Sequence, residues 1–423
     1  MLKRKIAVIG SGISGLSAAY YLKEKYDVSL FEKNNYYGGH SNTVNINYNN
    51  CKIAVDTGFI VFNDKTYPNL LKFFNELDIK YHKSNMSFAV KIDQKNLEYS
   101  GTNIFSIFAQ PKNLFNLKFI KMLRDILYFN KKALNFIKDK GHGNEYSVAM
   151  LIKDLKLGEF FTYNYLLPMS GAIWSCSIDK MLNYPALSFI NFFENHGLLT
   201  VNNQPQWYSV INGSKQYVDK AIDNIGVKNV YKNSKISKIH VTSSKKLAIR
   251  FNDKIEQYDK VILACHANES LNIIEEPNAQ QIEILSSFNY QDNVAILHKD
   301  SSLMPRAKRA WSSWVYNYNE KNHHNISVTY WMNNLQNIDN KYPLFVSLNP
   351  DQEINERDIF GAYKYEHPIF DRRAIDAQSK IDHIQGVNNI YYCGAYCGNG
   401  FHEDGIKSAL NVVDKIKNDD FKI

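Results

Sequence analysis

One segment near the N-terminus, residues 5–33, constrains the fold of this 423-residue chain more than any other. It opens with a short apolar run, Ile6–Ile9, which is typical of a buried strand. Three glycines follow with G-x-G-x-x-G spacing, and the apolar pattern after them predicts a helix over 16–25 and a strand over 28–31. These glycines are Gly10, Gly12 and Gly15. This order predicts a Rossmann βαβ unit that binds a dinucleotide.

Each position in this segment has a physical role. The first glycine permits a tight turn, the second lets a pyrophosphate approach the backbone, and the third lets helix and strand pack closely. The free N–H groups of the helix N-terminus favour phosphate, and Glu32 ends the second strand where it can accept from a ribose hydroxyl. The predicted binding residues here are Gly10, Gly12, Ile13, Ser14, Gly15, Glu32 and Lys33. The alternative is an ordinary βαβ unit with a glycine-rich turn.

Two later segments carry further glycines that fit the same site. Paired glycines follow Glu32, and a strand over 52–57 leads into a second turn. Near the C-terminus, a strand over 390–393 precedes a glycine-rich turn and a helix over 406–416, whose N-terminus would stabilise negative charge. The residues predicted to contact cofactor in these segments are Gly38, Gly39, His40, Ser41, Thr57, Gly58, Phe59, Gly394, Asp404, Gly405 and Ile406.

The combination of these pieces resembles the amine-oxidase and phytoene-desaturase class of FAD flavoproteins. The shared features are the G-x-G-x-x-G, the acid after the second strand, the Gly-Gly pair and the D-x-G at Asp56–Gly58. The resemblance implies FAD as the cofactor, an α/β fold with a Rossmann-like FAD-binding domain, and an inserted α+β substrate domain. It also implies an adenine contact, for which Ile236 is the candidate. The usual Gly-Asp of the class is Gly394-Ala395 here, so the acid is either displaced or missing, and Asp404 is the candidate substitute.

Several longer phrases resemble one bacterial branch of predicted NAD/FAD-binding proteins. These phrases are VDTGFIVFN at 55–63, EYSGT at 98–102, LLPMSGAIWSC at 166–176, TYWM at 329–332, and the turn at 393–405. Members of this branch are associated with cyclopropane-fatty-acid-synthase-type methyltransferases. The resemblance therefore implies a desaturase or reductase of acyl chains, and a functional partnership with a fatty-acid methyltransferase.

The chain is long enough for a discontinuous two-domain architecture. We expect the FAD-binding domain at 1–72, 205–266 and 385–423, and the substrate-binding domain at 73–204 and 267–384. Within the latter, we expect a helical lid over 103–200 and a mixed sheet over 286–350. Aromatic residues in these insertions suit either a hydrophobic pocket or plain core packing. The predicted pocket residues are Tyr165, Trp174, Trp314, Tyr330 and Trp331.

The predicted reaction is hydride transfer between flavin N5 and an apolar substrate such as the acyl chain of a fatty acid or phospholipid. Tyr396, His402 and Glu403 are the acid/base candidates, because they are expected beside the ring. The alternatives are an amine oxidase, a non-redox flavin isomerase and a non-catalytic flavin-binding protein. The sequence contains no second G-x-G-x-x-G for NAD(P)H, and we predict no metal site.

Composition limits the location of the protein. Its five cysteines are scattered without zinc spacing, and neither a membrane-spanning run nor room for a signal peptide is evident, so we predict a cytoplasmic protein. Of the net charge of +8, the segment 112–140 holds +6, from eight basic and two acidic residues. Two interpretations stay open: peripheral contact with an anionic inner membrane, or a lid whose lysines are solvated. We expect no nucleic-acid partner.

Overall fold

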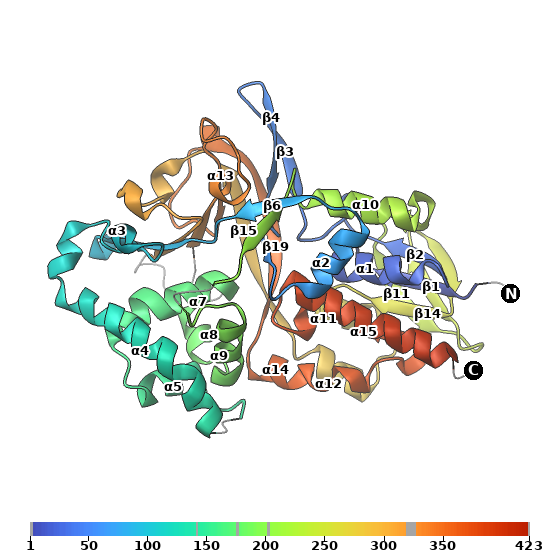
Figure 1. Cartoon of the computed structure of the whole chain (residues 1–423). Coiled ribbons are helices and arrows are strands. Elements are labelled where there is room, and N and C mark those ends of the chain that lie inside the picture. Colours follow the sequence, from blue (N-terminus) through green and yellow to red (C-terminus); the bar gives the residue numbers. More distant parts are fainter. Residues whose placement is uncertain (1–2, 141–142, 175–176, 201–203, 319–326, 422–423) are drawn as a thin grey trace.

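The computed structural model describes residues 3–140, 143–174, 177–200, 204–318 and 327–421. It has a nucleotide-binding part built on a parallel sheet and a second part in which helices lie below a mixed sheet (Figure 1). Both chain ends lie on the side of the nucleotide-binding part, far from the helices of the second part (Figure 1). The predicted α/β fold with an inserted α+β part is therefore confirmed.

The nucleotide-binding sheet has five parallel strands in the order β10-β2-β1-β14-β20. They are β1 (Lys5–Ile9), β2 (Asp27–Phe31), β10 (Val230–Tyr231), β14 (Lys260–Leu263) and β20 (Ile390–Tyr392). Every residue of β14 and β20 is buried, as expected for a sheet covered on both faces. On one side lie α1 (Ile13–Leu22), α10 (Lys215–Ile225) and α15 (His402–Phe421), and on the other lies the three-stranded sheet β11 (Ile236–Val241), β12 (Leu247–Phe251) and β13 (Lys254–Tyr258).

A seven-stranded mixed sheet forms the upper half of the second part in Figure 1. Its order is β19-β15-β18-β17-β16-β7-β8, and all its pairs are antiparallel except β16 with β7. The strands are β7 (Phe88–Ile92), β8 (Leu97–Ser100), β15 (Asn289–His298), β16 (Trp314–Tyr318), β17 (Ser327–Trp331), β18 (Phe345–Leu348) and β19 (Ile359–Ile369). The sheet thus recruits residues on both sides of the expected range 286–350.

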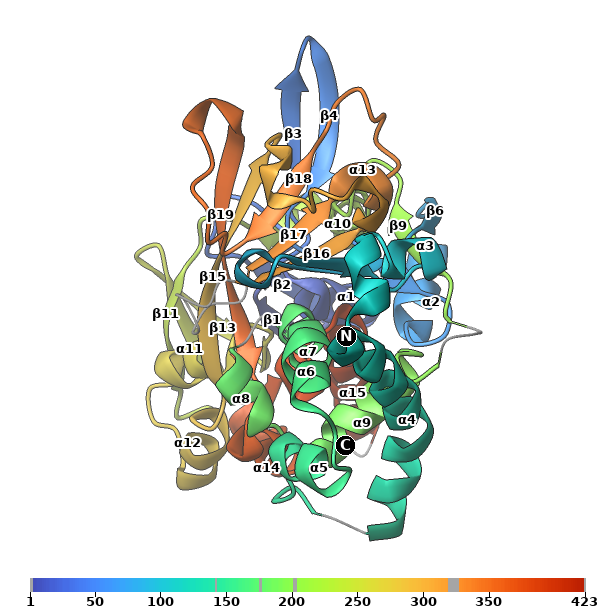
Figure 2. The ribbon, with the colours of Figure 1, turned by 90° about the vertical axis from the view of Figure 1, so that its left-hand side faces the viewer.

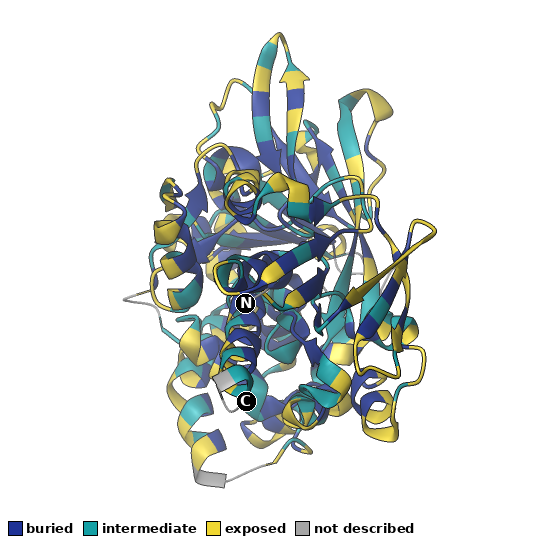
Figure 3. Cartoon of the chain, turned by 90° about the vertical axis from the view of Figure 1, so that its right-hand side faces the viewer, coloured by how far each residue is buried: buried dark blue, intermediate teal, exposed yellow. Residues whose placement is uncertain are grey.

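Helices fill the lower half of the second part and pack under the sheet (Figure 2). They include α3 (Ile104–Ile107), α4 (Leu117–Lys140), α5 (Val148–Asp154), α6 (Glu159–Phe161), α7 (Leu167–Trp174), α8 (Ile178–Leu182) and α9 (Ala186–Asn195), with a π-helical turn at Thr162–Leu166. Their apolar faces share one hydrophobic cluster with β7, β8, β16 and β17. Burial follows this arrangement, with dark sheet interiors and lighter outer helix faces (Figure 3).

Three helices of the second insertion pack against the nucleotide-binding sheet instead. They are α11 (Ala267–Ile273), α12 (Ala279–Leu285) and α14 (Arg372–Gln378), and their buried residues belong to the cluster around β14 and β20. The helix α2 (Pro68–Glu76) likewise joins the cluster around α1 and α10. The hairpin of β3 (Thr43–Tyr48) and β4 (Cys51–Asp56) projects beside the mixed sheet (Figure 1). Of the helices described, none is both long and apolar enough to cross a bilayer.

Candidate dinucleotide and active site

The first glycine turn is crowded everywhere except at its second glycine. Gly10 has φ +103°, and a Cβ there would lie 2.7 Å from the Ala264 carbonyl oxygen. A Cβ on Gly15 would lie 1.8 Å from the Gly10 carbonyl oxygen. Because glycine has no Cβ, helix and strand can pack this closely. A Cβ on Gly12 would meet nothing within 4 Å. The open space at Gly12 is the place where a pyrophosphate would approach the backbone.

Two helix N-termini meet at this turn. Gly12 is the N-cap of α1, and no side chain of the described residues caps the helix, which leaves its first N–H groups open to a ligand. A Cβ on Gly405, in the first turn of α15, would lie 2.8 Å from Ile13 Cγ2 and 2.9 Å from Ser14 Oγ. Figure 1 shows α1 and α15 side by side. Both helix dipoles therefore place partial positive charge at the same end of the sheet.

Glu32 closes the turn from the end of β2. Its buried carboxylate accepts from the Ser11 amide at 3.0 Å, from Ser11 Oγ at 2.6 Å and from the Asn34 amide at 2.9 Å. These bonds fix the loop that holds Gly12. The neighbouring Lys33 turns away and pairs with Glu269 on α11.

The Gly38-Gly39 pair brings a second loop against the first. The Gly38 amide donates to the Ser11 carbonyl oxygen at 3.1 Å, and a Cβ on Gly39 would lie 3.3 Å from Gly12 Cα. His40 follows, and its Nε2 is buried without a hydrogen-bond partner among the described residues. Burial, with three further histidines nearby, lowers the pKa of His40 well below its usual value, so the ring is neutral. The Nε2 atom of His40 is thus a buried polar atom beside the glycine turns.

His402 joins the last glycine turn to the loop after the Gly-Gly pair. Its Nε2 lies 2.8 Å from Ser41 Oγ and 3.3 Å from the Tyr217 hydroxyl, and these two oxygens also bond each other. Phe59 stacks on the imidazole with ring centroids 3.6 Å apart. Burial lowers the pKa of His402 to about 3, so the ring is neutral at physiological pH. The structure thus brings together three residues that are far apart in the chain.

The loop carrying Thr57 and Gly58 is positioned by buried contacts. Thr57 Oγ1 lies 2.7 Å from the Tyr365 hydroxyl, and a Cβ on Gly58 would lie 2.3 Å from the His40 carbonyl oxygen. Asp56, the acid of the D-x-G segment, was not among the predicted binding residues, and it anchors this loop. Its carboxylate accepts from Thr43 Oγ1 at 2.6 Å, from Ser214 and from Gln336 Nε2 at 3.0 Å. Burial outweighs these bonds and raises the pKa of Asp56 to about 6.

The other two acid/base candidates differ: Glu403 is engaged in structural hydrogen bonds, whereas Tyr396 packs through its ring and its hydroxyl has no hydrogen-bond partner among the described residues. The Glu403 carboxylate accepts from the Asn69 amide at 3.1 Å, from Asn69 Nδ2 at 2.6 Å and from the Leu70 amide at 3.0 Å, so it caps α2. Tyr396 is 3% exposed, and its ring packs against Phe288 with centroids 4.8 Å apart. Burial raises the pKa of this phenol well above its usual value. Their catalytic roles stay predictions.

The remaining cofactor candidates are also placed. Asp404 accepts from the Phe401 amide at 2.9 Å, and burial raises its pKa to about 6. The Gly394 amide donates to Ser408 Oγ at 2.9 Å, and a Cβ on Gly394 would lie 2.4 Å from the Tyr396 ring. Ile406 is fully buried between α15 and the sheet, and Ile236 is 4% exposed at the start of β11.

Four of the five predicted pocket residues pack on one hydrophobic cluster, which joins the helices to the mixed sheet. Trp314 and Tyr330 face each other across β16 and β17 at 4.9 Å, and Phe401 of the last glycine turn stacks on Phe192 of α9 at 5.2 Å. The indole Nε1 atoms of Trp174 and Trp314 are buried without a hydrogen-bond partner in the described part of the chain. The other two members are Tyr165 and Tyr330.

Trp331 packs elsewhere. It packs with Trp311 at 5.2 Å in a separate cluster, because successive residues of a strand point to opposite faces of the sheet. Trp331 therefore does not share the hydrophobic cluster of Tyr330, and its role as a pocket residue stays a prediction. The alternation of β17 carries the signal that separates them.

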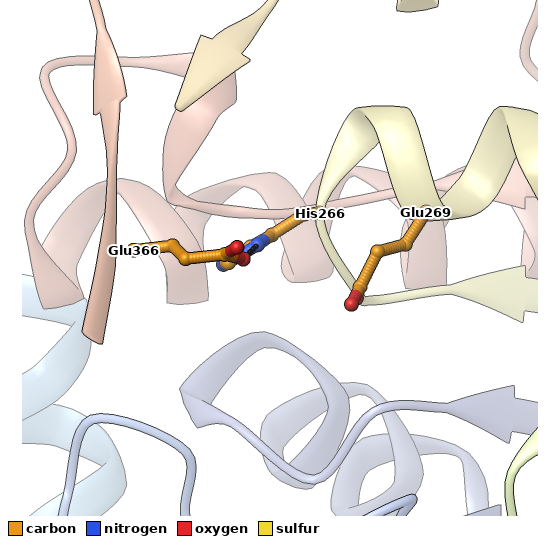
Figure 4. Close-up of side chains that lie close together, drawn as sticks. All are labelled: His266, Glu269 and Glu366. Atoms are coloured by element: carbon orange, nitrogen blue, oxygen red, sulfur yellow. Dashed lines mark hydrogen bonds and ion pairs between the residues drawn. The ribbon is translucent and has the colours of Figure 1, made fainter. Parts of the chain in front are cut away.

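A group of polar residues lies at the seam between the two parts. His266 Nδ1 lies 3.0 Å from Glu366 Oε2, and Figure 4 shows these two side chains pointing toward one another, with Glu269 beside them on α11. One ring nitrogen of His266 and one carboxylate oxygen each of Glu269 and Glu366, the kinds of atom that can ligate a metal ion, lie within 4.8 Å of one another. The Lys33 ammonium already supplies positive charge to Glu269.

Sequence reasoning missed the contribution of β19 to this region. Its residues Tyr365 and His367 stack beside His40, with ring centroids at 5.0 and 5.3 Å. Burial lowers the pKa of His367 to about 4. Tyr217 of α10 was missed as well, since no local motif marks a buried tyrosine that reaches His402.

Comparisons with known proteins agree with this geometry. A family model described as an NAD(P)-binding Rossmann-like domain matches residues 8–77. The 1-hydroxycarotenoid 3,4-desaturase of Flavobacterium sp. (strain P99-3) is 33% identical over 119 residues, which is 24% of this chain and 23% of the desaturase. The coproporphyrinogen III oxidase of Staphylococcus aureus (strain NCTC 8325 / PS 47) is 24% identical over 311 residues, which is 64% and 62%. The chain therefore spans less than two thirds of each curated relative.

Solved structures match over nearly the whole chain. The CLA-producing fatty acid isomerase from P. acnes has a TM-score of 0.68 at 13% identity and covers 97% of this chain and 98% of its own. Putrescine oxidase bound to putrescine has a TM-score of 0.70 at 14% identity and covers 99% of each chain. The two-part fold is thus shared with these proteins.

Proposed function

We propose that this chain is an FAD-dependent oxidoreductase. The observation that carries the proposal is the open space at Gly12, which lies where the N-termini of α1 and α15 meet. Positive helix ends and open space beside the Cα of the central glycine are what a cofactor diphosphate requires. The named relatives, a desaturase and an oxidase, support redox chemistry over a scaffold role.

The residues present fit FAD. Gly12, Gly39 and the first turn of α1 would hold the diphosphate, and Glu32 would accept from the ribose. The buried Nε2 of His40 is the nitrogen free to bond a cofactor oxygen. The loop at Gly58-Phe59 and the turn before α15 would hold the ring, where the α15 N-terminus favours negative charge.

A bound flavin would supply hydride transfer at its N5 atom. The chain's own contribution is orientation, electrostatics and exclusion of water. Neutral His402 forms a buried hydrogen-bond network with Ser41 and Tyr217. This network holds a proton at the two hydroxyl oxygens near the last glycine turn. The aromatic cluster around Trp314 and Phe401 excludes water from the region of the last glycine turn.

The proposed substrate is an acyl chain of a fatty acid or phospholipid. The cluster around Trp314 is aromatic and aliphatic, which suits an apolar chain. The buried indole N–H groups of Trp174 and Trp314 offer donors that an ester or carboxyl oxygen would satisfy. A fatty acid isomerase on the same fold and a carotenoid desaturase relative act on apolar molecules by name. A functional partnership with a fatty-acid methyltransferase rests on the sequence phrases alone.

The cofactor is tested by the visible spectrum of the purified protein and of a Gly12→Val variant. The added Cβ meets nothing within 4 Å, so we expect the variant to fold, while its side chain fills the place of the diphosphate. We expect a yellow wild type that dithionite bleaches and a folded, colourless variant. The control is Gly101→Val, because Gly101 also has open space and lies away from the turn. A colourless wild type that takes up no FAD would overturn the proposal.

The substrate is tested by anaerobic flavin bleaching. We expect phospholipids with unsaturated or methylated acyl chains to bleach the flavin, if they are hydride donors, or to reoxidise the dithionite-reduced flavin, if they are acceptors. Trp314→Phe, which keeps an aromatic side chain but removes the indole N–H, should raise the lipid concentration needed. Bleaching by putrescine or another primary amine, with no lipid effect in either direction, would replace the acyl-chain substrate by an amine.

A further inference from the structure

The helical end of the second part carries exposed apolar side chains that the proposed chemistry does not use. We call five of them the apolar tip: Ile104, Phe105, Leu114, Phe115 and Leu117. Phe115 is 88% exposed, Leu117 is 84% exposed and Phe105 is 72% exposed. Large apolar side chains so exposed and so close in sequence are unusual on a soluble surface and mark an interaction site.

The apolar tip is held on ordered, capped elements. Asn103 and Ser106 form a capping box that starts α3, and the Asn116 side chain accepts from the Lys118 and Phe119 amides at the start of α4. The opposite side of α4 is anchored, since Phe119 packs on Tyr99 with ring centroids 5.4 Å apart. The exposure of the tip is therefore built into the fold.

The outer face of α4 continues the tip with basic residues. Six exposed cations make up this basic face: Lys118, Lys121, Arg124, Lys131, Lys132 and Lys138. None of the six forms an ion pair with a residue that the structure describes. Between 104 and 138 the single acid is Asp125, whose carboxylate accepts from the Gly158 amide at 3.2 Å. The basic face therefore lacks internal neutralisation.

We propose that the apolar tip and the basic face dock the protein onto an anionic phospholipid bilayer. The cations would lie over the lipid headgroups while Phe115 and Leu117 enter the interface, as in amphipathic membrane-binding helices. A second copy of this chain fits less well, because two such faces would place like charges against each other. α3 and α4 lie on the side facing the viewer in Figure 2, away from the nucleotide-binding sheet. This inference does not depend on the proposed redox function.

Co-sedimentation with vesicles tests the proposal, using the full chain. We expect binding to vesicles of phosphatidylcholine with phosphatidylglycerol, weakening as salt rises, and little binding to phosphatidylcholine alone. The triple variant Lys121→Gln, Arg124→Gln and Lys131→Gln should bind about 100-fold more weakly, since each basic residue near the surface contributes roughly fivefold. The double variant Phe115→Ser and Leu117→Ser should bind about tenfold more weakly.

Matched controls remove the same charge or apolar area elsewhere. Lys228→Gln, Lys235→Gln and Lys254→Gln together, and Val227→Ser with Ile255→Ser, change exposed residues outside the surface and should leave vesicle binding unchanged. Absence of binding to anionic vesicles, or equal binding to both vesicle types, would overturn the proposal. So would a dimer in light scattering that Phe115→Ser and Leu117→Ser dissolve without any effect on vesicle binding.

Discussion

At the scale of single residues, hydrogen-bond partners decide what a side chain can do. The carboxylate of Glu403 accepts hydrogen bonds from three donors at the start of α2. His402 instead lies within hydrogen-bond distance of two hydroxyl groups. The same turn therefore carries one residue that holds a helix and one that belongs to a hydrogen-bonded chain.

Replacing Glu403 by Ala should lower the free energy of unfolding by about 1–2 kcal/mol, the usual loss on removing a helix cap. Glu403→Gln should cost less, because one amide oxygen can still accept from Leu70. Urea unfolding followed by circular dichroism measures both, with exposed Glu353→Ala as the control. Full stability of Glu403→Gln with complete loss of substrate-dependent flavin turnover would indicate a catalytic role instead.

His402 should not titrate during turnover. Because burial lowers its pKa to about 3, the ring stays neutral from pH 5 to 8 and adds no acid limb to the rate of flavin reduction. His402→Gln should therefore change the rate without changing the shape of the pH profile. Stopped-flow flavin reduction across this range checks the prediction. A limb near pH 6.5 that disappears in His402→Gln would contradict it.

At the scale of elements, one buried carboxylate ties three of them together. Asp56 at the end of β4 bonds Ser214 at the start of α10 and Gln336 just after α13 (Met332–Leu335). We expect Asp56→Ala to lower the free energy of unfolding by at least about 3 kcal/mol, because several buried donors lose their acceptor. Urea unfolding measures this loss. Asp219→Ala, which removes an exposed pair with Lys215, is the control and should cost less than about 0.5 kcal/mol.

The elements also show where sequence patterns succeed and where they fail. The βαβ unit is predictable because glycine spacing and apolar runs are local signals, and β14 and β20 stand out as apolar runs. The strand β19 is not predictable in the same way. Most of its residues are only half buried, and it contains Gly361 and Pro368, so it lacks period-2 alternation. Yet this strand brings Tyr365 and His367 to the site.

Contacts between distant elements were equally beyond sequence reasoning. The glycines, Glu32 and the last turn could be assigned to one site because each lies in a motif with a known mechanical role. The bond between Tyr217 and His402 depends on how α10 and α15 pack, which no spacing encodes. Trp331 shows a different limit, since its face was available from alternation along β17.

At the scale of the whole molecule, several buried histidines make the fold sensitive to acid. Burial lowers the pKa to about 4 for His196, His298 and His367, to about 3 for His402, and well below the usual value for His40. A histidine whose folded pKa lies below its unfolded pKa stabilises the protein above about pH 6.5. That contribution is lost as the pH falls from about 6.5 toward 4.

We therefore expect each neutral histidine to lower the free energy of unfolding by up to about 1.4 kcal/mol per pH unit between pH 6.5 and pH 5. The five histidines together should outweigh Asp56 and Asp404, whose raised pKa of about 6 acts in the opposite direction over this range. Urea unfolding at several pH values measures the slope. His298→Gln, which can keep a hydrogen bond to Ser347, should reduce this slope by the contribution of one histidine, up to about 1.4 kcal/mol per pH unit. Exposed His240→Gln is the control. A stability that rises on acidification through this range would contradict the prediction.

The meeting of α1 with α15 has a consequence for how the protein is made. The first glycine turn leaves the ribosome early, whereas Gly405, which packs against Ile13 and Ser14, is translated almost four hundred residues later. The contact between the first glycine turn and α15 can therefore form only after α15 has been synthesised. We therefore expect a chain that stops before α15 to bind FAD more weakly than one that includes it.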